Sequence, residues 1–569
     1  MFLRIEPVTS MLFVFLIVSL GMSDPASALP KTPRDPTPPV TTRKAPPGAS
    51  VITILDLSGQ KGVTNGDRLG LQHALDAFGI PYRITNNLQK AVKAPEMLIV
   101  AWNLSPDLPP ALLTQLRNAL AGWSQRSGRT LWLAGASDAE LLKTLGIVQN
   151  GSSSTTRSVL RLNNKHPLAS YVDAPEEHEV WLASTNTNQY VLTRAYAPLA
   201  KSAWSNSVLG RYPDGRIGAL TIRHRTGGGR VVLIGVKWKD LLTRMENQKH
   251  GDHTRGGTNV FEPSTDTVRL WLRAGYQQWA GHPSLRPRAP NGKKAAVLLT
   301  HDIDARSAFL PLRDSFIPLE TSLGMRSTLM VTTSYRRNGW ITDFYSDANH
   351  HVILAKALAK GFEVQSHSVS HLPDMDSWRP GPALERPKNY APNYNKTTSK
   401  TTGGYVLPEL LISARLLEQD FGIGIRGWRS GHLLRPRGLG ELLEASGYAW
   451  DSSHNSGRVG GSYPYLMLSD FAIQGRETPV LTLPLAISDS RIETRTATKN
   501  AALWLDVTRK NAANGAPTVL LVHPTKPEIK LPALKLYLKA IKKDPNLWVG
   551  PVDAWYTWYR KQGIRSQQP

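Results

Sequence analysis

The chain has 569 residues, no cysteine, and 68 Lys and Arg against 44 Asp and Glu, which gives a formal net charge of +24. The absence of cysteine excludes a disulfide framework, a lipid-anchored cysteine behind a leader, and any thiol nucleophile. At roughly 100–200 residues per domain the length predicts more than one domain.

The N-terminus predicts a secretory signal peptide over residues 1–28. Arg4 precedes an apolar run over 11–22, and Ala26-Ser27-Ala28 supplies the small residues of a cleavage site. The run is shorter than the roughly 20 apolar residues that cross a bilayer. We therefore expect cleavage, no stable membrane span afterwards and a periplasmic or secreted protein, with retention as a membrane anchor as the alternative.

The positive charge predicts attraction to anionic partners. The basic residues are dispersed, no zinc-finger or RNA-recognition signature occurs, and the signal peptide points away from the cell's nucleic acid. We expect no nucleic-acid partner and favour an anionic envelope polymer, with a generally basic, solubilising surface as the alternative.

Residues 29–48, rich in Pro, Thr and basic side chains, predict an extended linker. Residues 49–282 then predict an α/β domain with a doubly wound parallel sheet. Its expected strands are 51–55, 97–102 and 130–134, and its expected helices are 66–78 and 112–123. From about 154 to 236 short strands with Gly-rich turns predict either a β-rich insertion or return strands of the same sheet, before a closing helix over 265–279.

Residues 283–294, rich in Pro, Gly and basic side chains, predict an interdomain linker. Residues 295–565 then alternate strand-like and helix-like segments, which predicts a parallel β/α barrel or a distorted relative of one. The expected strands are 295–300, 328–332, 362–366, 423–428, 448–451, 480–484 and 519–522, and the expected helices 348–360, 407–421, 439–446 and 534–543.

Polar side chains follow five of these strands, where the loops of parallel β/α folds gather reactive groups. Asp302 and Asp304 follow the first strand and point to one side at spacing i, i+2. His367 and His371 follow a later strand, and a helical turn there would stack them. One carboxylate with two imidazoles forms the ligand set of a catalytic zinc-type site, which leaves the other carboxylate as a base. Three further strands end at Arg429, Asp451 and His523.

Each of these residues also has a structural interpretation. An isolated pair of carboxylates at a strand end is often a helix cap or a turn, and His523 could be a hydrogen-bonded core histidine. The functional interpretation depends on their occurring together.

The motifs resemble those of the polysaccharide deacetylases, the NodB-homology or carbohydrate esterase family 4 enzymes, over about residues 290–565. The sequence 367–371, His-Ser-Val-Ser-His, reproduces the family's His-(Ser/Thr)-x-x-His motif, and 521–523 resembles its late Leu-x-His motif. The segment 300–304, Thr-His-Asp-Ile-Asp, resembles a variant of its first motif. Arg429-Ser430-Gly431-His432 occupies the place of Arg-x-Pro-Tyr, and 447–451 resembles the fourth motif.

The resemblance implies a fold of NodB-homology type, and it implies that Asp304, His367 and His371 hold a divalent metal, most often zinc, whose bound water becomes nucleophilic. Asp302 would be the general base and His523 the general acid for the departing amine.

Arg429 would orient and ionise Asp302, and Asp451 would do the same for His523. The implied substrate is an N-acetylated amino-sugar polymer. Gly431 and His432 depart from the family's Pro and Tyr, which leaves the oxyanion contact open.

The insertion 372–407 should overhang the site, where its aromatic residues could stack on sugars or pack on one another. The N-terminal half resembles, more faintly, class I glutamine amidotransferase-like or flavodoxin-like folds. It has Ser137 where an amidotransferase would carry its cysteine. We expect this serine to cap the helix over 139–145, with a serine nucleophile as the alternative. We expect this half to bind carbohydrate or a partner.

Three functions therefore stay open: a metal-dependent polysaccharide deacetylase, which we favour, an amidohydrolase or esterase acting on a non-carbohydrate acyl group, and a non-catalytic envelope polysaccharide-binding protein.

Overall fold

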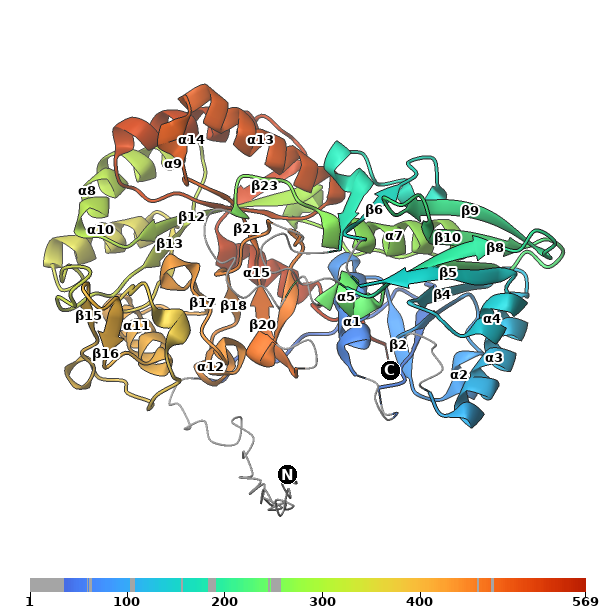
Figure 1. Cartoon of the computed structure of the whole chain (residues 1–569). Helices are drawn as coiled ribbons and strands as arrows, with labels where there is room; N and C mark the ends of the chain where they lie inside the picture. The colour runs from blue at the N-terminus through green and yellow to red at the C-terminus, as the bar shows by residue number, and fades with distance from the viewer. Residues whose placement is uncertain are drawn as a thin grey trace, which may run out of the picture.

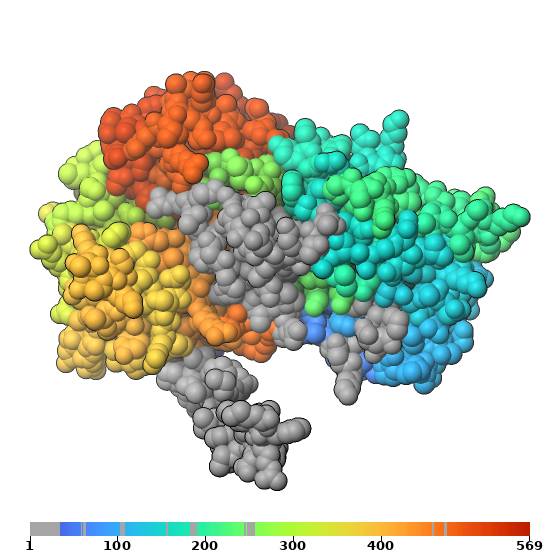
Figure 2. Space-filling view, viewed as in Figure 1, coloured from blue at the N-terminus to red at the C-terminus, as the bar shows by residue number. Residues whose placement is uncertain are grey.

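The computed structural model describes residues 35–58, 60, 64–102, 108–154, 157–182, 191–243, 246, 257–457, 460–471 and 475–568. In these parts an 11-stranded sheet and a 10-stranded sheet organise two halves that lie side by side (Figures 1 and 2). The predicted signal peptide lies outside the described residues. No helix among them combines the length and the apolar character needed to span a membrane.

The first sheet contains the doubly wound parallel core that the sequence predicts. The order β2-β1-β3-β4-β11 is parallel throughout. Along β3, Met97 and Ile99 pack in one core and Leu98 and Val100 in another, because successive side chains point to opposite faces and helices cover both. These strands are β1 Ile52–Leu55, β2 Tyr82–Thr85, β3 Met97–Val100, β4 Thr130–Ala134 and β11 Arg230–Ile234, and the helices are α1 Gly66–Phe78, α2 Leu88–Ala91, α3 Pro110–Ser124, α4 Ala139–Thr144, α5 Trp238–Leu241 and α7 Ser264–Trp279.

The β-rich segment continues this same sheet as antiparallel strands, so of the two alternatives the return strands are correct. They are β5 Ile147–Ser153, β6 Val159–Leu162, β7 Glu179–Trp181, β8 Thr193–Pro198, β9 Trp204–Arg211 and β10 Ile217–His224. Residues 183–190, within the segment predicted to be β-rich, lie outside the described residues. Ser137 does not cap α4: the cap is Asp138, whose carboxylate accepts a hydrogen bond from the Leu141 amide (2.9 Å) and pairs with Arg117.

The second half is a distorted β/α barrel, as expected. Its strands run in the order β19-β20-β18-β17-β14-β13-β12-β22-β21, with β23 also on β12, and all of these pairings are parallel except β19 with β20. The strands are β12 Ala295–Ile303, β13 Thr328–Val331, β14 Glu363–Ser366, β17 Gly427–Trp428, β18 Trp450–Asp451, β19 Tyr465–Leu468, β20 Glu477–Thr482, β21 Leu485–Ser488, β22 Thr518–Leu521 and β23 Leu547–Gly550. The helices of this half are α8 Phe309–Pro311, α9 Ile317–Ser322, α10 Ala348–Ala359, α11 Val406–Phe421, α12 Leu439–Ala445, α13 Ala497–Asn514, α14 Pro527–Lys542 and α15 Val552–Lys561.

The central strand β12 sorts its residues by the alternation of a strand. Ala296 and Leu298 pack in one core with residues of β18, β22 and α15, whereas Val297 and Leu299 pack in the larger core with residues of α10, α11, α13 and α14. Asp302 continues the row of Ala296 and Leu298. The alternation therefore aims its carboxylate to the same side of the strand.

The halves are joined by more than a flexible tether. In the predicted linker 283–294, the buried Arg286 donates to the carbonyl of Gly563 (2.7 Å), and its own amide donates to the Phe78 carbonyl (2.8 Å). Within the predicted linker 29–48, the described part lies against the second half, where the Thr37 hydroxyl donates to the Tyr448 carbonyl (2.7 Å). The described part of the first linker, 35–48, and the second linker are thus packed segments.

A buried cluster of charges also crosses the junction. The imidazole of His73 on α1 lies between Glu246 (2.6 Å) and Glu477 of β20 (2.9 Å), while Asp266 of α7 accepts a hydrogen bond from the Ser462 amide (2.6 Å). Buried ions are costly unless paired, so these contacts tie the halves to one arrangement.

Candidate active site

Asp302 and Arg429 form a buried ion pair inside the barrel. Nη1 of Arg429 donates to Oδ1 of Asp302 at 2.6 Å and to the Thr300 hydroxyl at 2.8 Å. The same guanidinium donates to the carbonyl (3.1 Å) and hydroxyl (3.0 Å) of Ser452. Arg429 is fully buried at the end of β17. The planar guanidinium therefore fixes the orientation of the Asp302 carboxylate.

Burial opposes ionisation of Asp302, but the charges of Arg429, His367 and His523 outweigh it and hold the pKa of Asp302 below its ordinary value. The carboxylate is thus available as a proton acceptor.

His367 and His371 follow β14 in an irregular loop, so the expected helical turn is absent there. Ser368 (φ 71°) and His371 (φ 49°) both lie in the left-handed region. The two imidazoles still approach, with ring centroids 4.9 Å apart. Nδ1 of His367 is hydrogen-bonded to the Arg429 carbonyl (2.8 Å), which directs Nε2 toward Asp302 Oδ2 at 3.5 Å.

Glu409 of α11 holds this loop in place. Its buried carboxylate accepts hydrogen bonds from the amides of Val369 (2.6 Å) and Ser370 (2.8 Å) and from the Tyr390 hydroxyl (2.8 Å). The sequence analysis did not single out Glu409, because a lone acidic residue in an amphipathic helix usually faces water.

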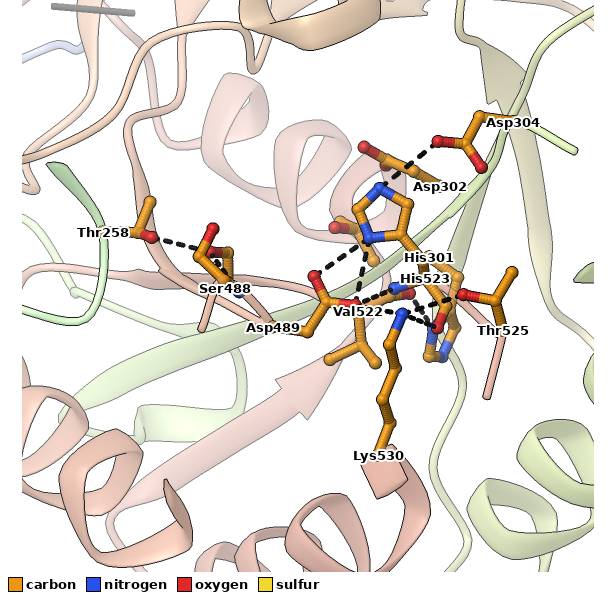
Figure 3. A network of polar contacts seen from close by, with 12 residues as sticks. Thr258, His301, Asp302, Asp304, Ser488, Asp489, Val522, His523, Thr525 and Lys530 are labelled. Atoms are coloured by element: carbon orange, nitrogen blue, oxygen red, sulfur yellow. Dashed lines mark hydrogen bonds and ion pairs between the residues drawn. The ribbon is translucent and has the colours of Figure 1, made fainter. Parts of the chain in front are cut away.

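His523 lies between two carboxylates, as Figure 3 shows. Its Nε2 is 3.5 Å from Asp304 Oδ2, and its Nδ1 is 3.0 Å from Asp489 Oδ1. The His523 amide also donates to Asp489 Oδ2 at 3.0 Å. Asp489, directly after β21, therefore sets the tautomer and the ring orientation.

The expected partner of His523, Asp451, is incorrect. Asp451 accepts hydrogen bonds from the hydroxyl (2.5 Å) and amide (3.2 Å) of Ser453, and burial raises its pKa against these contacts. In the strand order, four strands separate β18, which carries Asp451, from β22, which precedes His523. Strand β21 pairs with β22, and the residue after β21 is Asp489. The apolar run 485–487 followed by Ser488-Asp489 is the strand-end signal that could have identified Asp489.

Lys530 contacts Asp489 directly, and two residues of the N-terminal half contact Ser488, the residue before it. The ammonium of Lys530 on α14, itself buried, lies 2.7 Å from Asp489 Oδ2 and also donates to the Thr525 hydroxyl (2.9 Å). From the N-terminal half, Asn259 pairs with the backbone of Ser488: its Nδ2 donates to the carbonyl (2.9 Å) and its Oδ1 accepts from the amide (3.0 Å). Thr258 contacts the same serine (2.6 Å).

The three predicted metal ligands suit a divalent ion in donor type. Asp304 Oδ2 lies 3.8 Å from His371 Nε2, too long for a hydrogen bond. Two donors on one tetrahedral zinc ion, each about 2 Å from it, lie roughly 3.3 Å apart. Within the described parts of the chain no three His, Asp or Glu side chains are gathered closely enough to form a complete ligand set. The donors therefore fit in type, and the Asp304–His371 pair lies near the spacing of a zinc site, whereas Nε2 of His367 faces Asp302.

Gly431 and His432 stand against the metal-ligand loop. A Cβ atom on Gly431 would come within 3.0 Å of the Cα and ring of His371, so glycine permits the approach. His432 (φ 55°) places its ring 4.3 Å from that of His371. This aromatic contact is what the chain has in place of the family's Pro and Tyr.

The site opens into a pocket of about 400 Å³. Asp304, Asp489 and His523 line it, together with Arg491 and Lys526. The insertion 372–407 contributes mainly packing, since Trp378 and Tyr390 are buried.

No protein-family model and no curated protein matches the chain. Solved structures similar to it include a putative polysaccharide deacetylase from Mycobacterium smegmatis, with 18% identity over 48% of this chain and 92% of that one, at a TM-score of 0.36. A probable polysaccharide deacetylase from Pseudomonas aeruginosa covers 50% of this chain and 96% of its own at 13% identity and a TM-score of 0.33. Agd3, described as a novel carbohydrate deacetylase, covers 90% of this chain and 87% of its own at 10% identity and a TM-score of 0.36.

The resemblance given by the motifs thus has counterparts among solved structures. At these TM-scores, any activity has to be argued from this chain's own residues.

Proposed function

We propose that the C-terminal half is a metal-dependent N-deacetylase that removes acetyl groups from an amino-sugar polymer. The observation that carries the proposal is a pair of separately oriented acid–base groups in one barrel. His523 lines the pocket, and Asp302 is buried near enough for the charge of His523 to lower its pKa. Asp302 is held by Arg429, and His523 is held by Asp489. Two titratable groups with different partners are what amide hydrolysis needs, because one proton must be removed and another delivered.

In the proposed reaction water adds to the acyl carbon and the C–N bond breaks. Asp302, kept ionised beside Arg429, accepts the proton of the attacking water. His523 delivers a proton from Nε2 to the departing amine, while its Nδ1 proton stays on the ring, hydrogen-bonded to Asp489. The products are acetate and a free amine.

Asp304, His367 and His371 would hold the divalent ion. When bound, the ion would supply Lewis-acid polarisation of the acyl carbonyl. We propose zinc, because two histidines and one carboxylate are a ligand set of zinc hydrolases. The loop that presents the two histidines is fixed by Glu409.

We further propose that the protein acts in the periplasm or outside the cell, on an envelope polymer or exopolysaccharide. The support is the signal peptide predicted for residues 1–28 and the net charge of +24. The identity of the N-terminus of the protein recovered from cell fractions tests this location. Uncleaved cytoplasmic protein would contradict it.

Acetate release from a panel of N-acetylated polymers tests the activity. We expect release that stops with a chelator, returns with zinc, and falls at least about a hundredfold in Asp302→Asn, since a general base contributes about 10²–10⁴ in rate. Asp314→Asn is the matched control, because that aspartate is exposed and pairs only with its neighbour Arg313. Release that is insensitive to chelator, or equal in Asp302→Asn and Asp314→Asn, would refute the mechanism.

The same panel separates the alternatives. Hydrolysis of small acyl esters or amides with none from polymers would indicate an esterase or amidohydrolase acting on other acyl groups. Polymer binding without hydrolysis in zinc would indicate a polysaccharide-binding protein.

A further inference from the structure

An exposed tryptophan stands beside the candidate metal-ligand loop. Trp340 lies between β13 and α10 with 40% of its surface exposed. Its ring meets that of His432 edge to face at a centroid distance of 5.8 Å, and the His432 ring lies 4.3 Å from His371. Trp340 is therefore two ring contacts away from a proposed ligand of the metal.

The Trp340 segment is tied to this loop by hydrogen bonds. Oδ1 of Asn338 accepts from the amides of Trp340 (3.1 Å) and Ile341 (2.9 Å), while its Nδ2 donates to the Ser370 carbonyl (2.8 Å). Asn338 is buried. One side chain thus joins the tryptophan to the loop that presents His367 and His371.

The hairpin of β15 Asn393–Asn395 and β16 Lys400–Thr402 supports the same ring. Tyr394 packs against Trp340 at 5.4 Å with an interplanar angle of 80°, and its amide donates to the Asn338 carbonyl (2.8 Å). Gly339, at φ 80°, lies so close that a Cβ would meet the Tyr394 carbonyl at 2.1 Å. The ring is fixed before a ligand arrives, so little rotamer entropy remains to be lost on binding.

We propose that Trp340 is the stacking platform of a sugar-binding subsite, one that holds the sugar next to the residue being deacetylated. The inference rests on the proposed function and extends it to the length of glycan that the site recognises. An exposed, immobilised aromatic ring presents a flat apolar surface, and the C–H face of a pyranose is its natural complement. The ring contacts His432, which in turn contacts His371, so this surface lies next to the loop that carries His367 and His371.

The surroundings of the platform are cationic. Arg336, Arg337 and Lys396 are exposed, and the Lys396 ammonium lies 5.9 Å from the Trp340 ring centroid. The segment 391–405 contains no acidic residue, and in 332–343 the one acidic residue, Asp343, is outnumbered by Arg336 and Arg337. The subsite therefore favours a glycan with carboxylates on the sugars that flank the N-acetylated one, and this preference weakens as salt screens the charges.

Two series of oligosaccharides test the subsite: N-acetylglucosamine oligomers, and oligomers that alternate N-acetylglucosamine with glucuronate. Each is measured from the single sugar upward for acetate release in zinc and for binding by calorimetry. The variants are Trp340→Ala, Trp340→Tyr, and Trp181→Ala as matched control. Trp181 is equally exposed, at 40%, but lies on the first sheet.

We expect Trp340→Ala to raise KM and the dissociation constant of oligomers by about three- to tenfold, which is the worth of one aromatic contact. Trp340→Tyr should recover most of this loss. We also expect tighter binding of the glucuronate series at low salt, and a smaller difference at high salt. The effect should appear only once the oligomer is longer than one sugar, because the single sugar occupies the reaction site alone.

An equal response of Trp340→Ala and Trp181→Ala to every oligomer, in an enzyme that releases acetate, would overturn the subsite and leave the proposed function intact. Equal binding of both series at low salt would overturn its preference for anionic glycans. A wild type that neither binds nor hydrolyses any oligomer would overturn the subsite together with the proposed activity on polymers.

Discussion

Replacing Asp489 with Asn tests which aspartate orients the proposed general acid. The sequence points to Asp451, whereas the structure places Asp489 against His523. Asn keeps the size of the side chain and one acceptor oxygen. It removes the charge that faces the His523 ring and the buried Lys530 ammonium.

The magnitude follows from the contacts that are lost. Asp489 accepts from the ring and amide of His523, both at 3.0 Å, and pairs with Lys530 at 2.7 Å. Hydrogen bonds to charged groups each contribute about 1.5–3 kcal/mol. A loss of about 3–4 kcal/mol from the transition state lowers kcat by about 10²–10³. KM should change little, because Asp489 meets the acid and not the acyl group.

Asp451→Asn is the matched comparison. Asp451 contacts Ser453 and is fully buried, so its replacement should lower the stability of the fold by about 1–3 kcal/mol and leave most of kcat.

The assay is acetate release at saturating substrate, with thermal unfolding of both variants recorded alongside. The assignment fails if Asp451→Asn loses as much kcat as Asp489→Asn at an unchanged melting temperature.

Three further outcomes follow from buried contacts. Arg429→Met leaves the Asp302 charge unpaired and should lower the free energy of unfolding, measured in urea, by about 3–5 kcal/mol. The double variant that adds Asp302→Asn should recover part of this loss, and no recovery would contradict the ion pair. Asn259→Gly permits the positive φ of 63° but removes both side-chain hydrogen bonds from Asn259 to Ser488. It should lower kcat more than it changes KM, and an unchanged kcat would show that Asn259 does not help to position Asp489. Burial, with the Asp553 charge, raises the pKa of Glu363 to about 7. The stability that the protonated Glu363 contributes is therefore fully present below pH 4.5, its ordinary pKa, and is lost as the pH rises through about 7. The melting temperature should fall less over that pH range in Glu363→Gln than in the wild type, and parallel curves would contradict this.

Much of the fold could be predicted because both sheets carry parallel strands buried on two faces. Such strands appear as short apolar runs between helices, as at 97–102 and 295–300. The short strand β21 was missed, because Pro484 interrupts its apolar run and β21 is only four residues long. Missing this strand is what hid Asp489.

The site residues fall into two groups, those at the ends of strands and those on helices. That Asp302, Asp304, His367, His371, Arg429 and His523 come near one another could be predicted, because each lies at the end of a recognisable strand or in the loop that follows it. Glu409 and Lys530 could not, since they project from helices that are otherwise ordinary amphipathic segments. The partner of a catalytic group is chosen by which strands are neighbours, and that order is a property of the folded sheet alone.

The junction between the halves reaches the candidate site at the end of β21. Asn259 and Thr258, which precede α7 of the first half, hold Ser488 by three hydrogen bonds, and the next residue is Asp489. On the far side of the junction His73 and Glu477 join α1 to β20. A shift of the first half by a fraction of a hydrogen-bond length would therefore move the carboxylate that orients His523. The N-terminal half thus serves the site as a fixed support, which accounts for the buried charges at the junction better than a loosely tethered binding module would.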